Sequence, residues 1–269
     1  MLENLQELRE PYLVKRKSIL QELSIGSWIQ IGHPSVAEIM ASAGFDWLAV
    51  DLEHSAITMR EAEDLIRVID LKGVAPLVRI ASNNSEQIKR VMDSGAHGVI
   101  VPMVKTVVEA ERAVKAVKYP PEGERSVGLA RAQGYGTRFG EYFEWQKTGS
   151  MVVVQIEHIE AVDNLQEILS VPGVDAYIVG PYDLTGSLGI PGDFEAQAYL
   201  EAIDEIQRIS QKLQVPGGIH IVEPDPKALD QAVRAGNQFI AYGVDTRMLD
   251  TVCRGGLDTL KYSLKGSAS

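Results

Sequence analysis

Three polar side chains near the middle of the chain have the types and spacing of a cation site. Gln155 and Glu157 stand two residues apart at the end of an apolar run, and Asp183 lies just beyond a second run that ends at Gly180. Strand side chains alternate, so Gln155 and Glu157 are expected to face the same pocket. Two convergent carboxylates with an amide beside them suit a hard divalent cation. Helix capping or contact with solvent would explain the same carboxylates equally well.

Other polar residues stand at or near the ends of further apolar runs. Asp51, Glu53 and His54 close one run, Arg79 lies within another, and Asp245 follows the last. A buried guanidinium is costly without a partner, so Arg79 must meet a carboxylate of the protein or of a substrate. Asp51 is interpreted as an acceptor of backbone amides in its loop, and His54 as either a catalytic group or a hydrogen-bonded surface residue. Three other histidines are given no catalytic role: His97, His158 and His220.

The elements that must position these residues begin with one β-α-β unit. The apolar runs Met151–Glu157 and Asp175–Gly180 flank a segment whose residues Ala161, Leu165 and Ile168 have helical spacing. A strand returns to a parallel neighbour through a crossover helix, and parallel strands have their carboxyl ends on one side. The carboxylates that follow the two runs can therefore point into a single pocket.

The same alternation extends over the chain. Strands are predicted at residues 27–32, 47–51, 76–80, 98–103, 151–157, 175–180, 218–222 and 239–244, with helices between them. This order, with no linker-like change in composition, predicts one (β/α)8 barrel domain over residues 1–269, preceded by a helical lead-in at residues 2–23. An open doubly wound sheet would need a glycine-rich phosphate turn after the first strand, and the sequence there does not match one.

Two local patterns add detail to this fold. Three Ser/Thr-x-x-Glu spacings predict capping boxes at helix starts, at Ser35–Glu38, Thr58–Glu61 and Thr106–Glu109. The longest irregular stretch runs from Tyr119 to about Tyr142. Loops of that length within compact domains are usually functional or mobile.

Composition limits the classes of partner. The chain of 269 residues is 45% apolar and carries a formal charge of −11, which argues against nucleic acid or an anionic membrane as its main partner. Cys253 is the only cysteine, so no intrachain disulfide is possible. The first residues lack an apolar signal region, and no run approaches about 18 apolar residues. A soluble cytoplasmic protein is therefore expected.

Other chemistries fit the sequence less well. It contains no Gly-x-Ser-x-Gly elbow, no Cys-x-x-Cys pair and no Walker loop. A Schiff-base aldolase needs a lysine on an inner strand position, and none of the predicted strands carries one. A carbanion formed in this pocket would have to be stabilised by a metal.

Six short motifs in order resemble the HpcH/HpaI aldolases, the class II pyruvate aldolases of the hydroxy-oxo-heptanedioate and keto-deoxy-sugar-acid type. The similarity runs from about Ile25 to Leu249. The motifs are Asp51-Leu-Glu-His54, Pro76-Leu-Val-Arg79, Val101-Pro-Met103, Tyr119-Pro-Pro121, Gln155-Ile-Glu157 and Gly180-Pro-Tyr-Asp-Leu184.

The resemblance implies a reaction and a set of roles. A 4-hydroxy-2-oxo acid would be cleaved to pyruvate and an aldehyde through a metal-stabilised pyruvate enolate. Glu157 and Asp183 would bind Mg²⁺ or Mn²⁺, with Co²⁺ as a further candidate, and Arg79 would hold pyruvate and its developing enolate oxygen. His54 would belong to the base system for the 4-hydroxyl proton. The oxo-acid would be seated by Gln155 and by the segment Gly180, Pro181, Tyr182 and Asp183.

The resemblance also pairs the catalytic histidine with an aspartate late in the third helix, which here is Asp93. Asp93 lies two residues before Gly95, where that helix is predicted to end at the bottom of the barrel, whereas His54 lies at the top. Either Asp93 caps its own neighbourhood or it contacts His54 across a subunit boundary. The second interpretation agrees with the homo-oligomer, a hexamer, that the resemblance implies.

Two other functions remain open. An acyl-CoA carbon–carbon lyase of the citryl- or malyl-CoA type would need a basic groove for the CoA phosphates, which this acidic chain does not display. A non-catalytic barrel that binds an oxo-acid would not need His54, Arg79, Glu157 and Asp183 together.

Overall fold

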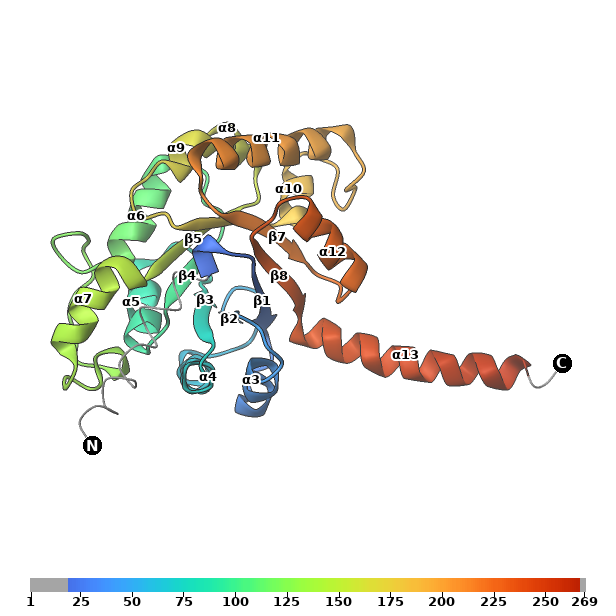
Figure 1. Ribbon diagram of the computed structural model, residues 1–269, viewed down its shortest axis with the longest axis horizontal. Coiled ribbons are helices and arrows are strands. Elements are labelled where there is room, and N and C mark those ends of the chain that lie inside the picture. The colour runs from blue at the N-terminus through green and yellow to red at the C-terminus, as the bar shows by residue number, and fades with distance from the viewer. Residues whose placement is uncertain (1–18, 267–269) are drawn as a thin grey trace.

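Eight parallel strands close into a barrel in chain order, β1 to β8 (Figure 1). The computed structural model describes residues 19–266, so most of the predicted helical lead-in lies outside the described residues. The (β/α)8 barrel expected from the sequence is confirmed. The strands are β1 (Ser24–Ile29), β2 (Trp47–Asp51), β3 (Ala75–Arg79), β4 (Gly98–Val101), β5 (Met151–Ile156), β6 (Ala176–Val179), β7 (Gly217–Ile221) and β8 (Phe239–Val244).

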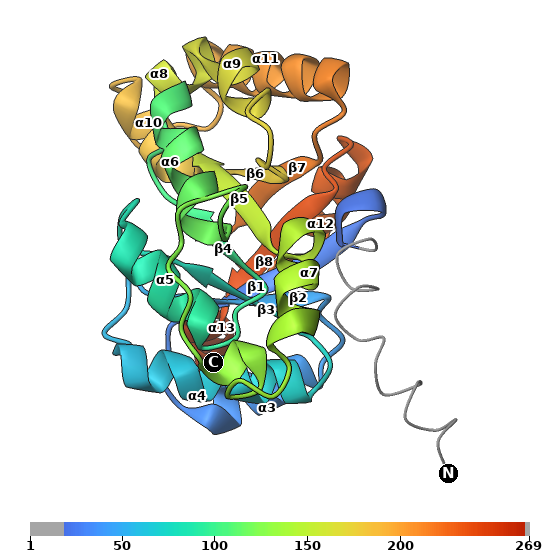
Figure 2. The same cartoon turned by 90° about the vertical axis from the view of Figure 1, so that its left-hand side faces the viewer.

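Helices follow the strands and flank the barrel (Figures 1 and 2). They are α3 (Pro34–Ala41), α4 (Met59–Leu71), α5 (Ser85–Asp93), α6 (Val107–Val117), α7 (Phe139–Gly149), α8 (Ile159–Asp163), α9 (Leu165–Leu169), α10 (Pro181–Ser187), α11 (Gln197–Leu213), α12 (Pro226–Arg234) and α13 (Asp245–Gly266). A short 3-10 helix, η1, spans Arg131–Gln133. Among residues 19–266, no helix combines the length and the apolar character needed to cross a membrane.

The lower part of the barrel interior is filled by aromatic side chains. Trp47 stacks on Phe239 with ring centroids 4.5 Å apart, and Trp28 meets Trp47 edge-on at 6.3 Å. A Cβ atom at Gly26 would lie 1.9 Å from the Trp47 ring, so glycine is required there for the indole to fit. This packing closes the barrel from below and leaves its mouth, at the carboxyl ends of the strands, for polar side chains.

Two of the three predicted capping boxes are confirmed and one is wrong. Thr58 and Thr106 each cap a helix together with the glutamate three residues later. The first helix instead begins at Pro34 with His33 as its N-cap, whose Nδ1 accepts from the Ser35 amide at 3.2 Å. Proline favours the first helical position because its φ is already helical and its missing N–H costs nothing there.

The stretch Tyr119 to Tyr142 is more ordered than its glycines and prolines predict. It contains η1 and the start of α7, a helix that the sequence pattern did not reveal. Tyr119, Tyr142 and Trp145 form a buried aromatic cluster beneath it. The segment between α6 and α7 runs over the outer side of α5 (Figure 2), so it covers the barrel wall.

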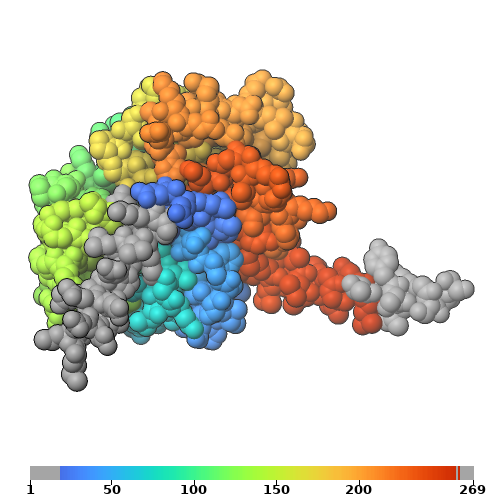
Figure 3. Space-filling model, in the orientation of Figure 1, coloured from blue at the N-terminus to red at the C-terminus, as the bar shows by residue number. Residues whose placement is uncertain are grey.

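The last helix, α13, extends away from the barrel (Figures 1 and 3). Its projecting part exposes four large apolar residues, each with more than half of its surface accessible: Leu249 at 58%, Val252 at 75%, Leu257 at 57% and Leu260 at 56%. Apolar side chains repeated along one helix usually become buried against another surface.

Candidate active site

Arg79 and Asp51 form a buried ion pair at the mouth of the barrel. They are register partners on β3 and β2. Nε and Nη2 of Arg79 donate to the two carboxylate oxygens of Asp51 at 2.9 and 2.7 Å. Burial alone would raise the pKa of Asp51, but the hydrogen bond and charge of Arg79 outweigh it and lower the pKa. The expectation that Arg79 must meet a carboxylate is confirmed.

Asp51 also organises the loop that follows β2. Its Oδ1 accepts from the backbone amides of Glu53 at 3.1 Å and His54 at 3.2 Å, which confirms its interpretation as an acceptor of backbone amides. Its Oδ2 accepts from Gln30 Nε2 at 2.9 Å. Gln30 was not anticipated from the sequence.

The guanidinium of Arg79 is supported on a second side by an indole. Its central carbon lies 4.3 Å from the centroid of the Trp28 ring, at the distance of a cation–π contact. Glu53 Oε2 is 3.4 Å from the Arg79 Nε. Trp28 was missed because its role depends on the strand order, in which interior side chains of β1 and β3 meet across β2. The remaining N–H groups of Arg79 are thereby available at the mouth.

Glu157 lies in a tight polar seat at the end of β5. Its Oε1 accepts from the Met103 backbone amide at 2.7 Å, and its Oε2 accepts from Gln155 Nε2. Met103 adopts a positive φ of 53°, an uncommon conformation for a residue with a side chain. A Cβ at Gly180 would lie 2.6 Å from Glu157 Oε2, so this glycine allows the close approach of the backbone.

Negative charge accumulates around Glu157. Burial, together with the charges of Glu53 and Asp183, raises its pKa to about 7 against the opposing hydrogen bonds from Met103 and Gln155. Asp183 is exposed in the first turn of α10. The structure thus brings the two predicted ligands, Glu157 and Asp183, within electrostatic reach of each other. A cation placed between them would relieve their repulsion.

The donor set fits a hard cation with open coordination positions. Within the part of the chain that the structure describes, no three His, Cys, Asp or Glu side chains converge closely enough to hold a metal ion by themselves. Two carboxylates would therefore leave the other positions to water and substrate oxygens, as Mg²⁺ commonly requires. Oxygen donors alone also match the preference of Mg²⁺ and Mn²⁺.

His54 and Asp93 lie at different ends of the barrel. His54 follows β2, is 58% exposed, and has its Nε2 3.6 Å from Glu53 Oε2. Asp93 is the last residue of α5, which leads back to the amino end of β4, and it accepts from Arg125. The structure does not bring the two residues together within one subunit, as their positions in the sequence indicated.

The remaining polar candidates have structural contacts. His97 lies 3.4 Å from Asp70 at the lower end of the barrel, and His158 caps α8. Asp245 accepts from the backbone amides of Gln30 and Ile31, which joins the ends of β8 and β1. His220 faces Trp28 with ring centroids 5.4 Å apart, and burial lowers its pKa to about 3, so it is neutral at physiological pH.

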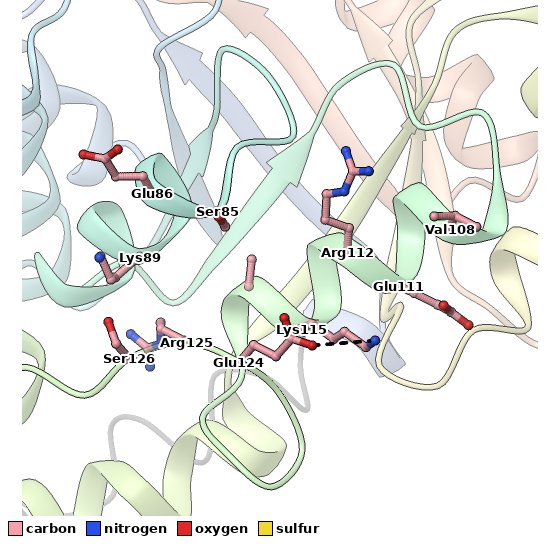
Figure 4. Close-up of a pocket in the computed structure, with 11 residues that line it drawn as sticks. Ser85, Glu86, Lys89, Val108, Glu111, Arg112, Lys115, Glu124, Arg125 and Ser126 are labelled. Carbon is pink, nitrogen blue, oxygen red and sulfur yellow. Dashed lines mark ion pairs between the residues drawn. The ribbon is translucent and has the colours of Figure 1, made fainter.

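A cavity of about 660 Å³ lies outside the barrel between α5 and α6 (Figure 4). Its lining carries charges of both signs: the basic residues are Lys89, Arg112, Lys115 and Arg125, and the acidic ones are Glu86, Glu111 and Glu124. Lys115 and Glu124 pair at 3.8 Å. This cavity lies on the outer side of two helices and not inside the barrel mouth, where barrel enzymes carry out chemistry.

Comparison with known proteins assigns the chain to a family. The profile of the HpcH/HpaI aldolase/citrate lyase family matches residues 24–251. The chain belongs to this family. The resemblance inferred from the six motifs is thereby confirmed.

Individual relatives agree with the family assignment. The chain is 39% identical over 228 residues to a hydroxypyruvate/pyruvate aldolase of Sagittula stellata, covering 84% of this chain and 89% of that one. It is 36% identical over 232 residues to the 2-keto-3-deoxy-L-rhamnonate aldolase of Escherichia coli K12, covering 84% and 85%. A crystal structure of an HpcH/HpaI aldolase from Desulfitobacterium hafniense DCB-2 superposes with a TM-score of 0.85 at 32% identity, over 93% and 96% of the two chains. These relatives support an aldolase, and so a lyase, of this family.

Proposed function

We propose that this HpcH/HpaI protein is a divalent-metal pyruvate aldolase that cleaves a 4-hydroxy-2-oxo acid to pyruvate and an aldehyde. The observation that carries the proposal is the seat of Glu157, where a buried carboxylate faces Gly180 and lies close to Asp183. The similarity to two aldolases supports the class of reaction.

Glu157 and Asp183 are the residues that would hold Mg²⁺ or Mn²⁺. When bound there, the metal would act as a Lewis acid toward negative charge on the C2 oxygen of the oxo-acid. Gln155 donates to Glu157, while its Oε1 is buried without a hydrogen-bond partner among residues 19–266. A substrate or water donor would satisfy that oxygen, which supports a role for Gln155 in seating the oxo-acid.

The segment that begins α10 would receive the substrate carboxylate. The Gly180 amide already donates to the Ile156 carbonyl at 3.2 Å, and Pro181 has no N–H. The amides of Tyr182 and Asp183 are therefore the donors that this segment can offer, because the first turn of a helix leaves its N–H groups unpaired. Gly180 and Pro181 would contribute shape rather than hydrogen bonds.

Arg79 and His54 would share the work at the reacting atoms. Arg79 is held rigidly by Asp51 and presents a fixed positive charge to the C2 oxygen as charge develops there. His54 would accept the 4-hydroxyl proton, directly or through water, as the bond between C3 and C4 breaks and the aldehyde leaves. Protonation of C3 then gives pyruvate.

We further propose a homo-oligomer, a hexamer, in which Asp93 of one subunit contacts His54 of the next. Asp93 lies beside Leu129 and Tyr135 on a concave surface, which encloses a pocket of about 460 Å³. These two side chains are 69% and 68% exposed, which is unusual for large apolar residues grouped together. The exposed apolar residues of α13 also favour assembly.

The deciding experiment is turnover with and without metal. The purified protein would be incubated with Mn²⁺, pyruvate and a panel of small aldehydes, and products would be followed by chromatography. We expect aldol product that disappears with EDTA and returns with added Mn²⁺. Undiminished turnover in EDTA would contradict the metal assignment, and binding of pyruvate with no turnover of any aldehyde would favour a non-catalytic barrel.

A further inference from the structure

Asp93 occupies a position that is locally unfavourable for a carboxylate. It ends α5, where the negative end of the helix dipole repels an anion. Burial raises its pKa, which further favours the uncharged form. A residue that violates its local preferences in this way is usually compensated by its surroundings and retained for function.

The compensation comes from Arg125, in the segment between α6 and α7. Its side chain is fully buried, and its Nη1 donates to Asp93 Oδ1 at 3.1 Å. Its Nη2 donates to the Tyr142 hydroxyl at 2.9 Å, and its guanidinium carbon lies 4.0 Å from the centroid of the Tyr119 ring. Figure 4 shows Arg125 beside Ser126 where this segment passes α5. Two aromatic rings and one carboxylate therefore fix the guanidinium.

The carboxylate is in turn restrained by more than one donor. Gln133 also hydrogen bonds Asp93, and its amide donates to the Tyr119 hydroxyl. Even so, 21% of the Asp93 side chain stays exposed. The exposed part borders the concave surface that contains Leu129 and Tyr135. Asp93 is thus held from inside the subunit and accessible from outside.

We infer that Arg125 is a positioning residue, which fixes Asp93 so that its exposed edge meets His54 of a neighbouring subunit. The inference rests on the proposed function, because it concerns the same intersubunit pair. Arg125 itself touches neither substrate nor metal. It acts through Asp93, and the rings of Tyr119 and Tyr142 hold its guanidinium in place.

The test compares Arg125→Gln with Arg138→Gln in the full-length protein. Arg138 is the control because it ends the same segment, pairs with the surface carboxylate of Glu141 at 2.9 Å, and does not line the concave surface that contains Asp93. We expect kcat for aldol cleavage to fall about a hundredfold in Arg125→Gln, since a displaced catalytic group can cost that much. The KM for the oxo-acid should stay unchanged, because the fully buried Arg125 side chain touches no part of the substrate. Arg138→Gln should keep kcat within about twofold.

A second variant separates positioning from folding. Arg125→Lys keeps a positive charge near Asp93 and should restore part of kcat, whereas a purely structural defect would not follow charge. The double variant Asp93→Asn with Arg125→Gln should be no slower than Asp93→Asn alone, because both changes disable one unit. Thermal unfolding of each variant identifies any that fail to fold, and Arg125→Lys then carries the comparison.

The outcomes distinguish this inference from the proposed function. If Asp93→Asn keeps wild-type kcat, the intersubunit pair is wrong, and the role of Arg125 falls with it. If Asp93→Asn loses kcat while folded Arg125→Gln or Arg125→Lys does not, only the positioning role is overturned. A KM increase with constant kcat in the Arg125 variants would also overturn it.

Discussion

Arg79→Lys offers the sharpest test of the barrel mouth, because it keeps the charge and removes the geometry. In the structure the guanidinium binds both oxygens of Asp51 and stacks on Trp28 at the same time. A lysine ammonium can donate to one of these oxygens but cannot reproduce the planar fork or the stacking. The substitution therefore tests whether positive charge alone is enough or whether the fixed position of the guanidinium is also needed.

The expected loss of stability follows from these contacts. The arginine side chain is 7% exposed and Asp51 is fully buried, so the pair is scarcely screened by solvent. Losing one charged hydrogen bond costs about 2 kcal/mol and losing the contact with the indole about 1 kcal/mol. The sum, about 3 kcal/mol, corresponds to a decrease in Tm of roughly 6–12 °C for a chain of this size.

The functional assay is exchange of the pyruvate methyl protons with deuterium, followed by NMR in the presence of Mn²⁺. This reaction isolates enolate formation from the aldehyde. We expect the exchange rate to fall about 10²–10³-fold, the typical effect of removing one group that stabilises a developing oxyanion. Arg67→Lys on α4 is the control, since Arg67 bonds the carboxylates of Glu63 and Asp64 on its own helix, outside the barrel mouth. A wild-type exchange rate in folded Arg79→Lys would refute the assigned role of Arg79.

Three further predictions concern the metal, pH and assembly. Glu157→Gln should lose Mn²⁺ binding in calorimetry without unfolding, whereas Gln155→Leu should weaken oxo-acid binding more than metal binding; retained Mn²⁺ affinity in Glu157→Gln would contradict the ligand assignment. Folding lowers the pKa of His220 to about 3, from about 6.5 in the unfolded chain. Between these two pH values only the unfolded state binds the proton, so the free energy of unfolding falls as the pH decreases below about 6.5. In urea unfolding, the free energy of unfolding of wild type should therefore fall by about 1–2 kcal/mol more than that of His220→Gln between pH 7 and pH 5. An equal pH dependence in the two proteins would disprove the effect. If Asp93 and His54 of neighbouring subunits form the proposed pair, sedimentation and assay at one low concentration should find no active monomer.

The sequence predicts most of the barrel because buried parallel strands are short apolar runs. The predicted strands at residues 47–51 and 239–244 have the observed bounds, whereas β1 spans Ser24–Ile29 rather than residues 27–32. The pattern failed for α7, where glycines and aromatic residues obscure helical spacing. Those aromatic residues serve the cluster around Tyr119, a tertiary contact that no local pattern encodes.

The site divides in the same way. Residue types and strand ends were enough to predict that Glu157 and Asp183 lie near each other and that Arg79 needs a carboxylate. They did not show that Asp51 would be that carboxylate, because the choice depends on the register of β2 against β3. Nor did they reveal that the backbone amide of Met103 donates to Glu157. That contact depends on the backbone conformation, with a positive φ at Met103, which the residue type does not predict.

A buried arginine–aspartate pair packed against an aromatic ring occurs at both ends of the subunit, but a different member of the pair is left accessible at each end. Arg79 and Arg125 are both buried, both lie against an aromatic ring, at 4.3 and 4.0 Å, and both bind a carboxylate. At the mouth, Asp51 is fully buried and the arginine offers its remaining N–H groups; at the lower end, the arginine is fully buried and Asp93 offers its exposed edge. Asp51→Asn should therefore cost stability of about 3–5 kcal/mol, because it leaves a buried charge unpaired. Asp93→Asn should also cost stability, because it leaves the fully buried Arg125 without its carboxylate, and it should in addition lower kcat. If folded Asp93→Asn kept the wild-type kcat, the division of roles between the two pairs would be wrong.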